Sequence, residues 1–368
     1  MPRGRILIYV EDPGAANFIA PVIGELQHAG WQIALAAAAA AADFFRDRQI
    51  SATPAPENRD AAAYIENTNA TVLMIGTSEN PDTFGFALVD AAREAGVRSI
   101  GFVDGPANPG LRFRGRDTDP VAHAPDRLLV CDDRTAEAFA GLSYPREQIV
   151  VTGHPYYDSV RDEAARLRTQ PTDAHRRRML PNAPSDRPVV VFLGEGSDGL
   201  GMDIKRRSPE YTLTGRGTSD RRTEIVLEEF LDAVDALPCE PYLVFRAHPK
   251  DPASGYSDYL SRFDTVSEGG RPLELLFAAD LVVGLSTSLL VEAALAGLNT
   301  MAILPARSQM YLVPTVLQGL TPCATDREAL HALLRQRLDS DGERTPVPPI
   351  ENASARVVEA INNIAGRP

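Results

Sequence analysis

Acidic residues follow two apolar runs that have the pattern of buried strands. Glu11 and Asp12 come directly after the run 6–10, and Asp104 comes directly after 97–103. In open α/β sheets, ligands bind beyond the carboxyl ends of the strands, where such carboxylates would project. A carboxylate there can take the proton of a hydroxyl that attacks another group. Asp104 is therefore a candidate general base, with Asp12 and Glu11 as alternatives, while an Asp-Gly turn is the simpler interpretation of Asp104.

Small and polar residues surround these acids. Gly14 leaves room for a ligand at the start of the next helix, whose free N–H groups favour anions and hydroxyl oxygens. Gly14 and Asn17 are thus candidate binding residues, although Asn17 could equally cap that helix. Arg112, in the basic loop 108–123, is a third candidate that would meet an acidic or phosphorylated ligand. A solvated loop is the alternative interpretation of this segment.

A basic sequence follows a strand pattern in the second half of the chain. Arg246 ends the run 241–246, and His248-Pro249 comes next. Cations at the end of a buried strand are costly unless an anion is close by. A phosphate fits this pattern, because His248 can donate a hydrogen bond while Arg246 adds charge, and Pro249 fixes the backbone. A purely structural role for His248 is the alternative interpretation.

Three hydroxyl residues follow another strand pattern. Ser286, Thr287 and Ser288 come after the run 280–284 and begin a predicted helix. Hydroxyls and free N–H groups at one helix start form a phosphate cradle, although serine and threonine are also the commonest helix caps. Glu292, further along this helix, could accept hydrogen bonds from a ribose diol.

Two glycine-containing turns complete the candidates. Gly194 follows the run 188–193 and opens a polar loop, 194–222, which we interpret as a mobile lid with almost nothing to bury. Gly153 and His154 follow the run 148–151. We interpret them as a turn near a domain boundary, with catalysis by His154 as the less favoured alternative.

The elements that must position these residues alternate between strand and helix patterns, which indicates parallel sheets covered by helices. The first series has predicted strands at 5–10, 32–36, 71–75, 97–103, 127–131 and 148–151. The second series has them at 188–193, 241–246, 280–284 and 299–303. Helices are predicted at 84–95, 223–236, 273–278, 288–296, 327–337 and 352–364, and the alanine run 36–42 is predicted to lead from a strand into a helix.

The chain of 368 residues is longer than one hydrophobic core usually serves. The two series predict two Rossmann-like α/β domains that face a cleft. We place the first domain at 1–158, a charged linker at 159–186, the second domain at 187–349 and a C-terminal helix at 350–368.

Charge and hydrophobicity exclude several classes of protein. The net charge of -13 argues against general nucleic-acid binding. No apolar run approaches the ~20 residues of a membrane span, and the short run after the N-terminus does not resemble a signal peptide. We therefore expect a cytoplasmic protein, with peripheral membrane contact left open. The three cysteines have no metal-type spacing, and no metal or bound cofactor is expected.

Taken together, these motifs resemble the GT-B superfamily of nucleotide-sugar glycosyltransferases. Three short motifs are similar to those of bacterial GT-B sialyltransferases, where an acidic pair before glycine carries the base and His-Pro and Ser-Ser/Thr bind phosphate. The matching positions here are Asp104-Gly105, His248-Pro249 and Ser286-Thr287, with Val103 in the place of one acid. His-Pro is also similar to that of the CDP-glycerol polymerising transferases.

The nonhydrolysing UDP-N-acetylglucosamine 2-epimerases are similar at other positions, mainly at 148–158 and 280–297. Their Ser-Gly-Gly turn and Glu-Glu pair correspond to Ser286-Thr287-Ser288 and Glu292-Ala293. Gly194-Glu195-Gly196-Ser197 lies where their His-Arg-Arg-Glu-Asn stretch would fall. The acids and bases that an epimerase needs are not matched, so this activity is the second alternative.

The resemblance implies a metal-independent glycosyltransferase that moves a sugar from a CMP-, CDP- or UDP-linked donor to a hydroxyl of a glycan or other acceptor, as in cell-surface glycan synthesis. In that interpretation the first domain binds the acceptor through Gly14, Asn17 and Arg112. The second domain binds the donor. A noncatalytic nucleotide-sugar-binding protein is the third alternative.

Overall fold

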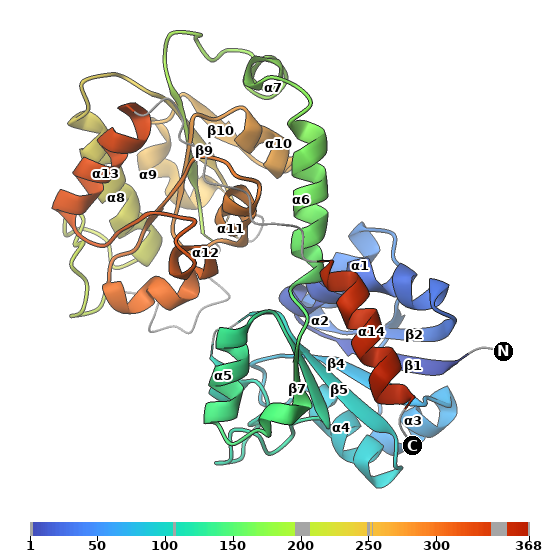
Figure 1. The fold of residues 1–368 in the computed structure, drawn as a ribbon. Coiled ribbons are helices and arrows are strands. Elements are labelled where there is room, and N and C mark those ends of the chain that lie inside the picture. Colours follow the sequence, from blue (N-terminus) through green and yellow to red (C-terminus); the bar gives the residue numbers. More distant parts are fainter. Residues whose placement is uncertain are drawn as a thin grey trace. The chain divides into compact units, whose positions relative to one another are not determined.

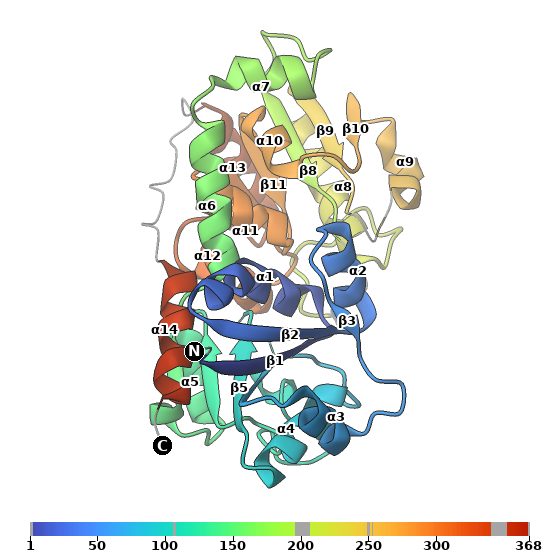
Figure 2. The same cartoon turned by 90° about the vertical axis from the view of Figure 1, so that its right-hand side faces the viewer.

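The computed structural model describes residues 3–105, 108–195, 207–248, 251, 253–339 and 352–366. The chain forms two compact units (Figures 1 and 2). The first combines Met1–Ser159 with Ile350–Pro368, and the second is Val160–Pro349. Each unit is an α/β structure built around its own parallel sheet, and the boundary between them falls within one helix, α6 (Pro155–Leu167).

The first unit contains a sheet of seven parallel strands in the order β3-β2-β1-β4-β5-β6-β7. The strands are β1 (Gly4–Val10), β2 (Trp31–Ala37), β3 (Thr53–Pro54), β4 (Val72–Gly76), β5 (Arg98–Val103), β6 (Arg127–Val130) and β7 (Ile149–Val151). Its helices are α1 (Pro13–His28), α2 (Ala39–Asp47), α3 (Ala61–Thr68), α4 (Phe84–Glu94), α5 (Asp133–Gly141) and α14 (Ala353–Ala365).

The buried faces of these helices explain why the sheet is covered on both sides. Ile6 and Ile8 of β1 belong to one hydrophobic cluster with α1, whereas Leu7 and Tyr9 of the same strand belong to another with α4. Neighbouring side chains in a strand point to opposite faces, so an unbroken apolar run is what a sheet buried on both faces requires.

The C-terminal helix α14 returns to the first unit, beside α1 in both views (Figures 1 and 2). Val357 and Ile361 are fully buried in the cluster that includes Phe18. The indole N–H of Trp31 donates a hydrogen bond of 2.9 Å to Asn362 Oδ1. The last helix therefore completes the core of the domain in which the chain begins.

The second unit contains a sheet of six parallel strands in the order β10-β9-β8-β11-β12-β13. The strands are β8 (Val189–Leu193), β9 (Tyr242–Arg246), β10 (Thr265–Ser267), β11 (Leu281–Gly284), β12 (Thr300–Ile303) and β13 (Cys323–Ala324). Its helices are α7 (Thr172–Met179), α8 (Arg222–Asp235), α9 (Ser257–Leu260), α10 (Pro272–Phe277), α11 (Ser288–Leu295), α12 (Pro314–Leu317) and α13 (Arg327–Asp339), with most of α6.

All ten predicted strands are confirmed, with ends that differ by at most one residue. The alanine run is confirmed as the end of β2 followed by α2. The prediction missed β3, β10 and β13, which have only two or three residues and lie at or near the sheet edges. Their sequences, Thr-Pro, Thr-Val-Ser and Cys-Ala, form no apolar run, in contrast to the equally short β7.

The arginine-rich segment after the first domain is helical and bound to the second unit. Arg176 of α7 donates to the carbonyl of Ala278 at 2.9 Å and pairs with Asp280. Arg178 pairs with Glu274 at 2.8 Å. These charges therefore attach α7 to the second sheet. Among the described residues no helix is both long and apolar enough to cross a membrane.

Candidate functional site

The acids predicted from the sequence meet at the carboxyl edge of the first sheet. The strand order reverses between β1 and β4, which have crossover connections to opposite sides. In open α/β sheets this is the position where the connecting loops separate and leave room for a ligand. Glu11 and Asp12 follow β1, Thr77 and Ser78 follow β4, and Asp104 follows β5.

Glu11 is a buried carboxylate whose oxygens are already used. One oxygen accepts from Ser78 Oγ at 2.9 Å and from Asn80 Nδ2 at 3.0 Å. The other accepts from Tyr9 Oη at 2.9 Å and from Thr83 Oγ1 at 2.6 Å. With 8% of the residue exposed, these four bonds offset the cost of burying its charge. The geometry gives Glu11 the task of holding the loop between β4 and α4.

Asp12 has an environment that suits a proton acceptor. It stands at the N-cap of α1 without making a side-chain cap hydrogen bond. Burial raises the pKa of its carboxyl above the ordinary value, the Ser78 hydroxyl lowers it, and the negative charges of Glu11 and Asp104 raise it further. A carboxylate with a raised pKa binds a proton more readily than an exposed aspartate, which is the property of a general base.

Asp104 lies against the first turn of α1. A Cβ atom added to Gly14 would be 1.8 Å from Asp104 Oδ2, so only glycine at this position allows the approach. The other oxygen, Oδ1, accepts from Thr77 Oγ1 at 3.3 Å and from Arg112 Nη1 at 3.4 Å. The structure thus brings Gly14 and Asp104, which are 90 positions apart by their numbering, into direct contact.

Arg112 is part of this cluster. The interpretation of its loop as solvated is wrong for this residue, which is 9% exposed and forms an ion pair with Asp104. Arg112 Nη1 also donates to Thr77 Oγ1 at 3.3 Å. By contrast, Arg116 from the same loop pairs with Asp82 at the surface. The sequence showed the arginines but not which of them would be buried.

His154 and Asn17 have buried polar atoms beside these acids. His154 Nδ1 and Asn17 Oδ1 find no hydrogen-bond partner within the described part of the chain. The imidazole packs between Phe18 and Tyr157, with ring centroids 5.1 and 4.3 Å away. Burial lowers the pKa of His154 to about 4, while the charge of Asp104 acts in the opposite direction. His154 is therefore neutral at physiological pH, with a free ring nitrogen.

Two of the sequence interpretations change at this edge. Asn17 does not cap α1, because the N-cap is Asp12 and Asn17 lies in the second turn. His154 follows β7 just as Asp104 follows β5, so its position after a strand indicated that it could lie at this edge. Its closeness to Asp104 could not be read from the sequence, because the two residues are far apart along the chain.

The corresponding edge of the second sheet also contains a reversal of strand order, between β8 and β11. Glu195 follows β8, and Ser286 follows β11. Glu195 Oε1 accepts from the Ser286 backbone N–H at 3.2 Å and from the Ser286 hydroxyl. Glu195 Oε2 forms an ion pair with Arg222 Nη1. Sequence patterns assigned no role to Arg222, and Glu195 was placed only within the stretch 194–197 that was compared with the epimerases.

Arg222 begins α8 and is almost completely buried, with 2% of its surface exposed. Its Nε donates to Gln309 Oε1 at 2.9 Å, and its Nη1 approaches Ser286 Oγ at 3.3 Å. The third nitrogen, Nη2, is buried and finds no partner among the residues described. Near the start of α11 the structure therefore contains a guanidinium with an unused donor.

The other hydroxyl residues divide between two roles. Thr287 is the N-cap of α11, and its hydroxyl oxygen accepts from the Leu290 N–H at 3.2 Å, which is the simpler interpretation made from the sequence. Ser288 is exposed at the first position of the helix. Glu292 is half-buried in the second turn. Only Ser286 joins the Glu195 and Arg222 pair.

Arg246 is positioned by the neighbouring strand. Its Nη1 donates to Ser267 Oγ at 3.0 Å and to the Gly269 carbonyl at 2.5 Å. Burial lowers its pKa. These bonds attach the ends of β9 and β10 to each other, so the charge of Arg246 has a structural use within the sheet.

His248 and Gly194 lie beside the end of β9. The backbone of His248 forms an isolated bridge with Asp251. Gly194 donates its N–H to the Arg246 carbonyl at 2.8 Å, and a Cβ at Gly194 would be 3.1 Å from Phe245. Pro249 lies outside the described residues. The predicted phosphate residues of this strand end are thus close together, and their ligand stays a prediction.

The described part of the long polar loop is bound to its domain. Buried Glu229 accepts from the N–H groups of Thr214 and Gly215, and buried Glu228 accepts from the N–H of Arg216. Leu213 is fully buried. The expectation that this loop buries almost nothing is therefore wrong for 207–221, while 196–206 lies outside the described residues.

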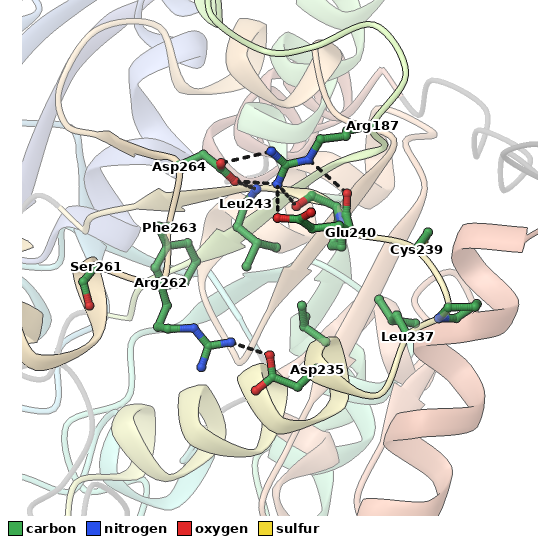
Figure 3. Close-up of a pocket in the computed structure, with 13 residues that line it drawn as sticks. Arg187, Asp235, Leu237, Cys239, Glu240, Leu243, Ser261, Arg262, Phe263 and Asp264 are labelled. Carbon is green, nitrogen blue, oxygen red and sulfur yellow. Dashed lines mark hydrogen bonds and ion pairs between the residues drawn. The ribbon is translucent and has the colours of Figure 1, made fainter.

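A hollow of about 630 Å³ opens at the opposite, amino edge of the second sheet (Figure 3). Arg187 precedes β8 and pairs with Asp264 at 3.2 Å, and Arg262 pairs with Asp235. Figure 3 shows both cations turned toward these acids. The charges in this hollow are paired, and they lie at the opposite end of the strands from Glu195. We therefore do not assign the hollow to the candidate site.

Comparison with known proteins identifies the fold. No protein-family model matches the chain, and no curated protein matches its sequence. Among solved structures, the Neisseria meningitidis UDP-GlcNAc 2-epimerase bound to UDP-GlcNAc is similar with a TM-score of 0.67 and 14% identity, covering 98% of this chain and 100% of that one. The Methanocaldococcus jannaschii UDP-GlcNAc 2-epimerase has a TM-score of 0.64 and 12% identity, covering 98% and 99%.

A solved structure with a different name is also similar. Acinetobacter baumannii MurG has a TM-score of 0.54 and 15% identity, covering 98% of this chain and 99% of that one. Together with the two parallel sheets, these similarities define the class: two Rossmann-like domains with the GT-B fold. The predicted fold class is confirmed. Identities this low establish the fold and leave the activity to the residues of the site.

Proposed function

We propose that this protein is a glycosyltransferase that uses a nucleotide-activated sugar and a hydroxyl acceptor. The observation that carries the proposal is the pair Asp12 and Asp104 at the carboxyl edge of the first sheet, where burial and neighbouring charge raise the pKa of Asp12. A base of this kind is what an attacking hydroxyl requires. The GT-B fold, which this chain shares with MurG, supports the proposal.

In the proposed reaction, the acceptor hydroxyl gives its proton to Asp12 as its oxygen forms a bond to the anomeric carbon. The bond between that carbon and the phosphate oxygen breaks, and its electron pair leaves with the phosphate. Asp104, fixed by Thr77 and Arg112, is the alternative base. The neutral ring nitrogen of His154 and the carbonyl oxygen of Asn17 are available to orient hydroxyl groups.

The second domain would bind the donor in this proposal. The start of α11 offers backbone N–H groups, Ser286 offers a hydroxyl, and Arg222 offers a buried cation. Such groups stabilise the negative charge that grows on a departing phosphate. His248 and Glu292 are proposed to contact the nucleotide. The donor nucleotide in this proposal is CMP, CDP or UDP, as the motif resemblance implies.

Epimerisation of a nucleotide sugar is the second candidate function. It is favoured by the similarity to two solved UDP-GlcNAc 2-epimerases. The gathering of Asp12, Asp104 and His154 at one edge also provides several groups that can exchange protons. An epimerase must remove a proton from C2 and return it, whereas a transferase leaves this proton in place.

One experiment separates the two functions. The full chain is incubated in D2O with UDP-GlcNAc and, separately, with other CMP-, CDP- and UDP-sugars, each with and without a panel of glycan acceptors, and followed by NMR. We expect nucleotide release that depends on an acceptor, with no deuterium at C2. Deuterium at C2 without an acceptor would instead establish the epimerase. If CMP-, CDP- and UDP-sugars all give neither result across the panel, the proposal of catalysis on nucleotide sugars is wrong.

A further inference from the structure

The Glu195 carboxylate takes up the donors that would otherwise bind a phosphate. One of its oxygens accepts from both the N–H and the hydroxyl of Ser286, and the other pairs with Arg222. A backbone N–H before a helix, a serine hydroxyl and an arginine are together a typical donor set for a phosphate oxygen. In this structure, a side chain of the protein itself makes these contacts.

We propose that Glu195 is an internal anion that a phosphate group must displace in order to bind at the start of α11, and that this residue therefore sets the affinity of the site for phosphate. The inference rests on the proposed function in one respect, namely that the ligand carries phosphate. It makes Glu195 a specificity-determining residue.

Electrostatics supports displacement over simultaneous binding. Arg222 is 2% exposed, so its charge acts in surroundings from which water is largely excluded. A carboxylate and a phosphate cannot share the Ser286 donors, and two anions side by side at such a buried position repel each other strongly. The Nη2 atom of Arg222, which lacks a partner within the described residues, adds a donor that Glu195 does not use.

The backbone geometry indicates how Glu195 would leave. Gly194 is fixed by its hydrogen bond of 2.8 Å to the Arg246 carbonyl. Tyr256 Oη donates its proton to Asp251 Oδ2 at 2.7 Å and lies 3.4 Å from the Glu195 carbonyl. The main chain is thus held directly before the residue that carries the carboxylate. We infer that rotation of the Glu195 side chain alone exposes Ser286 and Arg222, while the strand end stays in place.

A structural ion pair would have a different consequence. If Glu195 served only to neutralise Arg222, removing its charge would leave a buried cation that attracts anions whether or not the Ser286 donors take part. Displacement predicts a gain in phosphate affinity that needs the Ser286 hydroxyl, because Glu195 no longer occupies it. The loss of this gain on adding Ser286→Ala therefore separates the two roles.

The test measures binding of inorganic pyrophosphate to the full chain by calorimetry at constant ionic strength. We expect Glu195→Gln to lower the Kd roughly tenfold, because the competing negative charge is removed. Glu224→Gln is the matched control. It removes the same charge from the first turn of α8, where Glu224 pairs with Arg221 and not with Ser286, and it should leave the Kd nearly unchanged.

Glu195→Asp is a second variant, which keeps the test usable if Glu195→Gln does not fold. It keeps the charge beside Arg222 but shortens the side chain, so its carboxylate withdraws from Ser286. We expect its Kd to fall roughly threefold. The gain in either variant must disappear on adding Ser286→Ala. A folded Glu195 variant that binds pyrophosphate no more tightly than the wild type, or whose gain survives Ser286→Ala, overturns the inference.

The pyrophosphate experiment can succeed or fail whether or not the protein proves to be a glycosyltransferase. Tighter pyrophosphate binding by Glu195→Gln with no turnover of nucleotide sugars supports the internal anion and removes the transferase. Turnover by the wild type with unchanged pyrophosphate affinity in both Glu195 variants supports the transferase and removes the internal anion.

Discussion

The carboxyl edges of the two sheets have the same topology but opposite chemistry. In the first unit, Asp12 and Asp104 bring negative charge to the reversal of strand order, and Arg112 is the buried cation among them. In the second unit, Arg222 lies at the corresponding place, with Glu195 as its buried partner. One sheet architecture can therefore present either a proton acceptor or an anion-binding group.

The two edges also differ in how completely the charges are satisfied. Glu11 has four donors, and Arg246 donates to its neighbouring strand, so both serve the structure. By contrast, the pKa of Asp12 is raised, and Arg222 keeps one buried donor without a partner in the described chain. A buried charged group with unused hydrogen-bonding capacity lowers stability. Such a group is therefore a better candidate for binding a ligand than a fully hydrogen-bonded one.

The largest effect is expected from Asp12→Asn. If Asp12 is the base, donor turnover should fall by at least about 100-fold, since a positioned base contributes this much or more. The acidic limb of the wild-type pH–rate profile should lie above the ordinary range of aspartate, because burial raises the pKa of Asp12. The measurement is the turnover rate with a donor and acceptor pair found in the screen above.

Glu25→Gln is the control for this prediction, since Glu25 is an exposed acid on the same helix, α1. Its turnover should equal that of the wild type. A larger loss in Asp104→Asn than in Asp12→Asn would transfer the role of base to Asp104. Wild-type turnover in both variants would show that the acids at the carboxyl edge of the first sheet do not take part in catalysis.

Glu11→Gln should act on stability. The variant keeps the shape of the side chain but replaces one acceptor oxygen by an amide group, which faces two hydroxyl or amide donors. We expect the free energy of unfolding to fall by about 3 kcal/mol, because hydrogen bonds to a buried charge are lost. Urea denaturation measures this. A loss no greater than that of Glu25→Gln would contradict the structural role of Glu11.

His154 should make stability depend on pH. Because the pKa of His154 is about 4 in the folded protein, and an unfolded histidine titrates near 6.5, the unfolded chain binds more protons between these values. Stability is therefore lost as pH falls. The contribution of His154 between pH 7 and pH 5 is about 2 kcal/mol.

His154→Gln should remove this part of the pH dependence, as measured by urea denaturation at several pH values. His28→Gln, which changes an exposed histidine of α1, is the matched control and should keep the wild-type dependence. Equal slopes in the two variants would show that His154 is not held neutral in the folded protein.

Much of the fold could be predicted because its signals are local. Each predicted strand is a mainly apolar segment of three to seven residues in the structure, and helices such as α4 between them have one apolar face. The positions of Asp12, Asp104 and Ser286 after strands were predictable for the same reason. The strands β3, β10 and β13 were not, because their sequences Thr-Pro, Thr-Val-Ser and Cys-Ala form no apolar run, in contrast to Ile-Val-Val of β7.

The partners of the charged residues could not be predicted in this way. Ser286 is 91 residues from Glu195, and Thr83 is 72 residues from Glu11. Whether a charge is satisfied depends on such contacts, and no local pattern contains them. The loop arginines illustrate this, since Arg112 is buried against Asp104 while Arg116 stays at the surface.

Local patterns were enough to predict two helix-covered parallel sheets with polar residues after their strands, since backbone hydrogen bonding and apolar periodicity act over a few residues. Tertiary packing alone shows that Glu11 accepts four hydrogen bonds, that Arg222 is a buried cation, and that Glu195 occupies the Ser286 donors. Burial and hydrogen-bond partners arise when distant segments pack together, and these two quantities set what each charge can do.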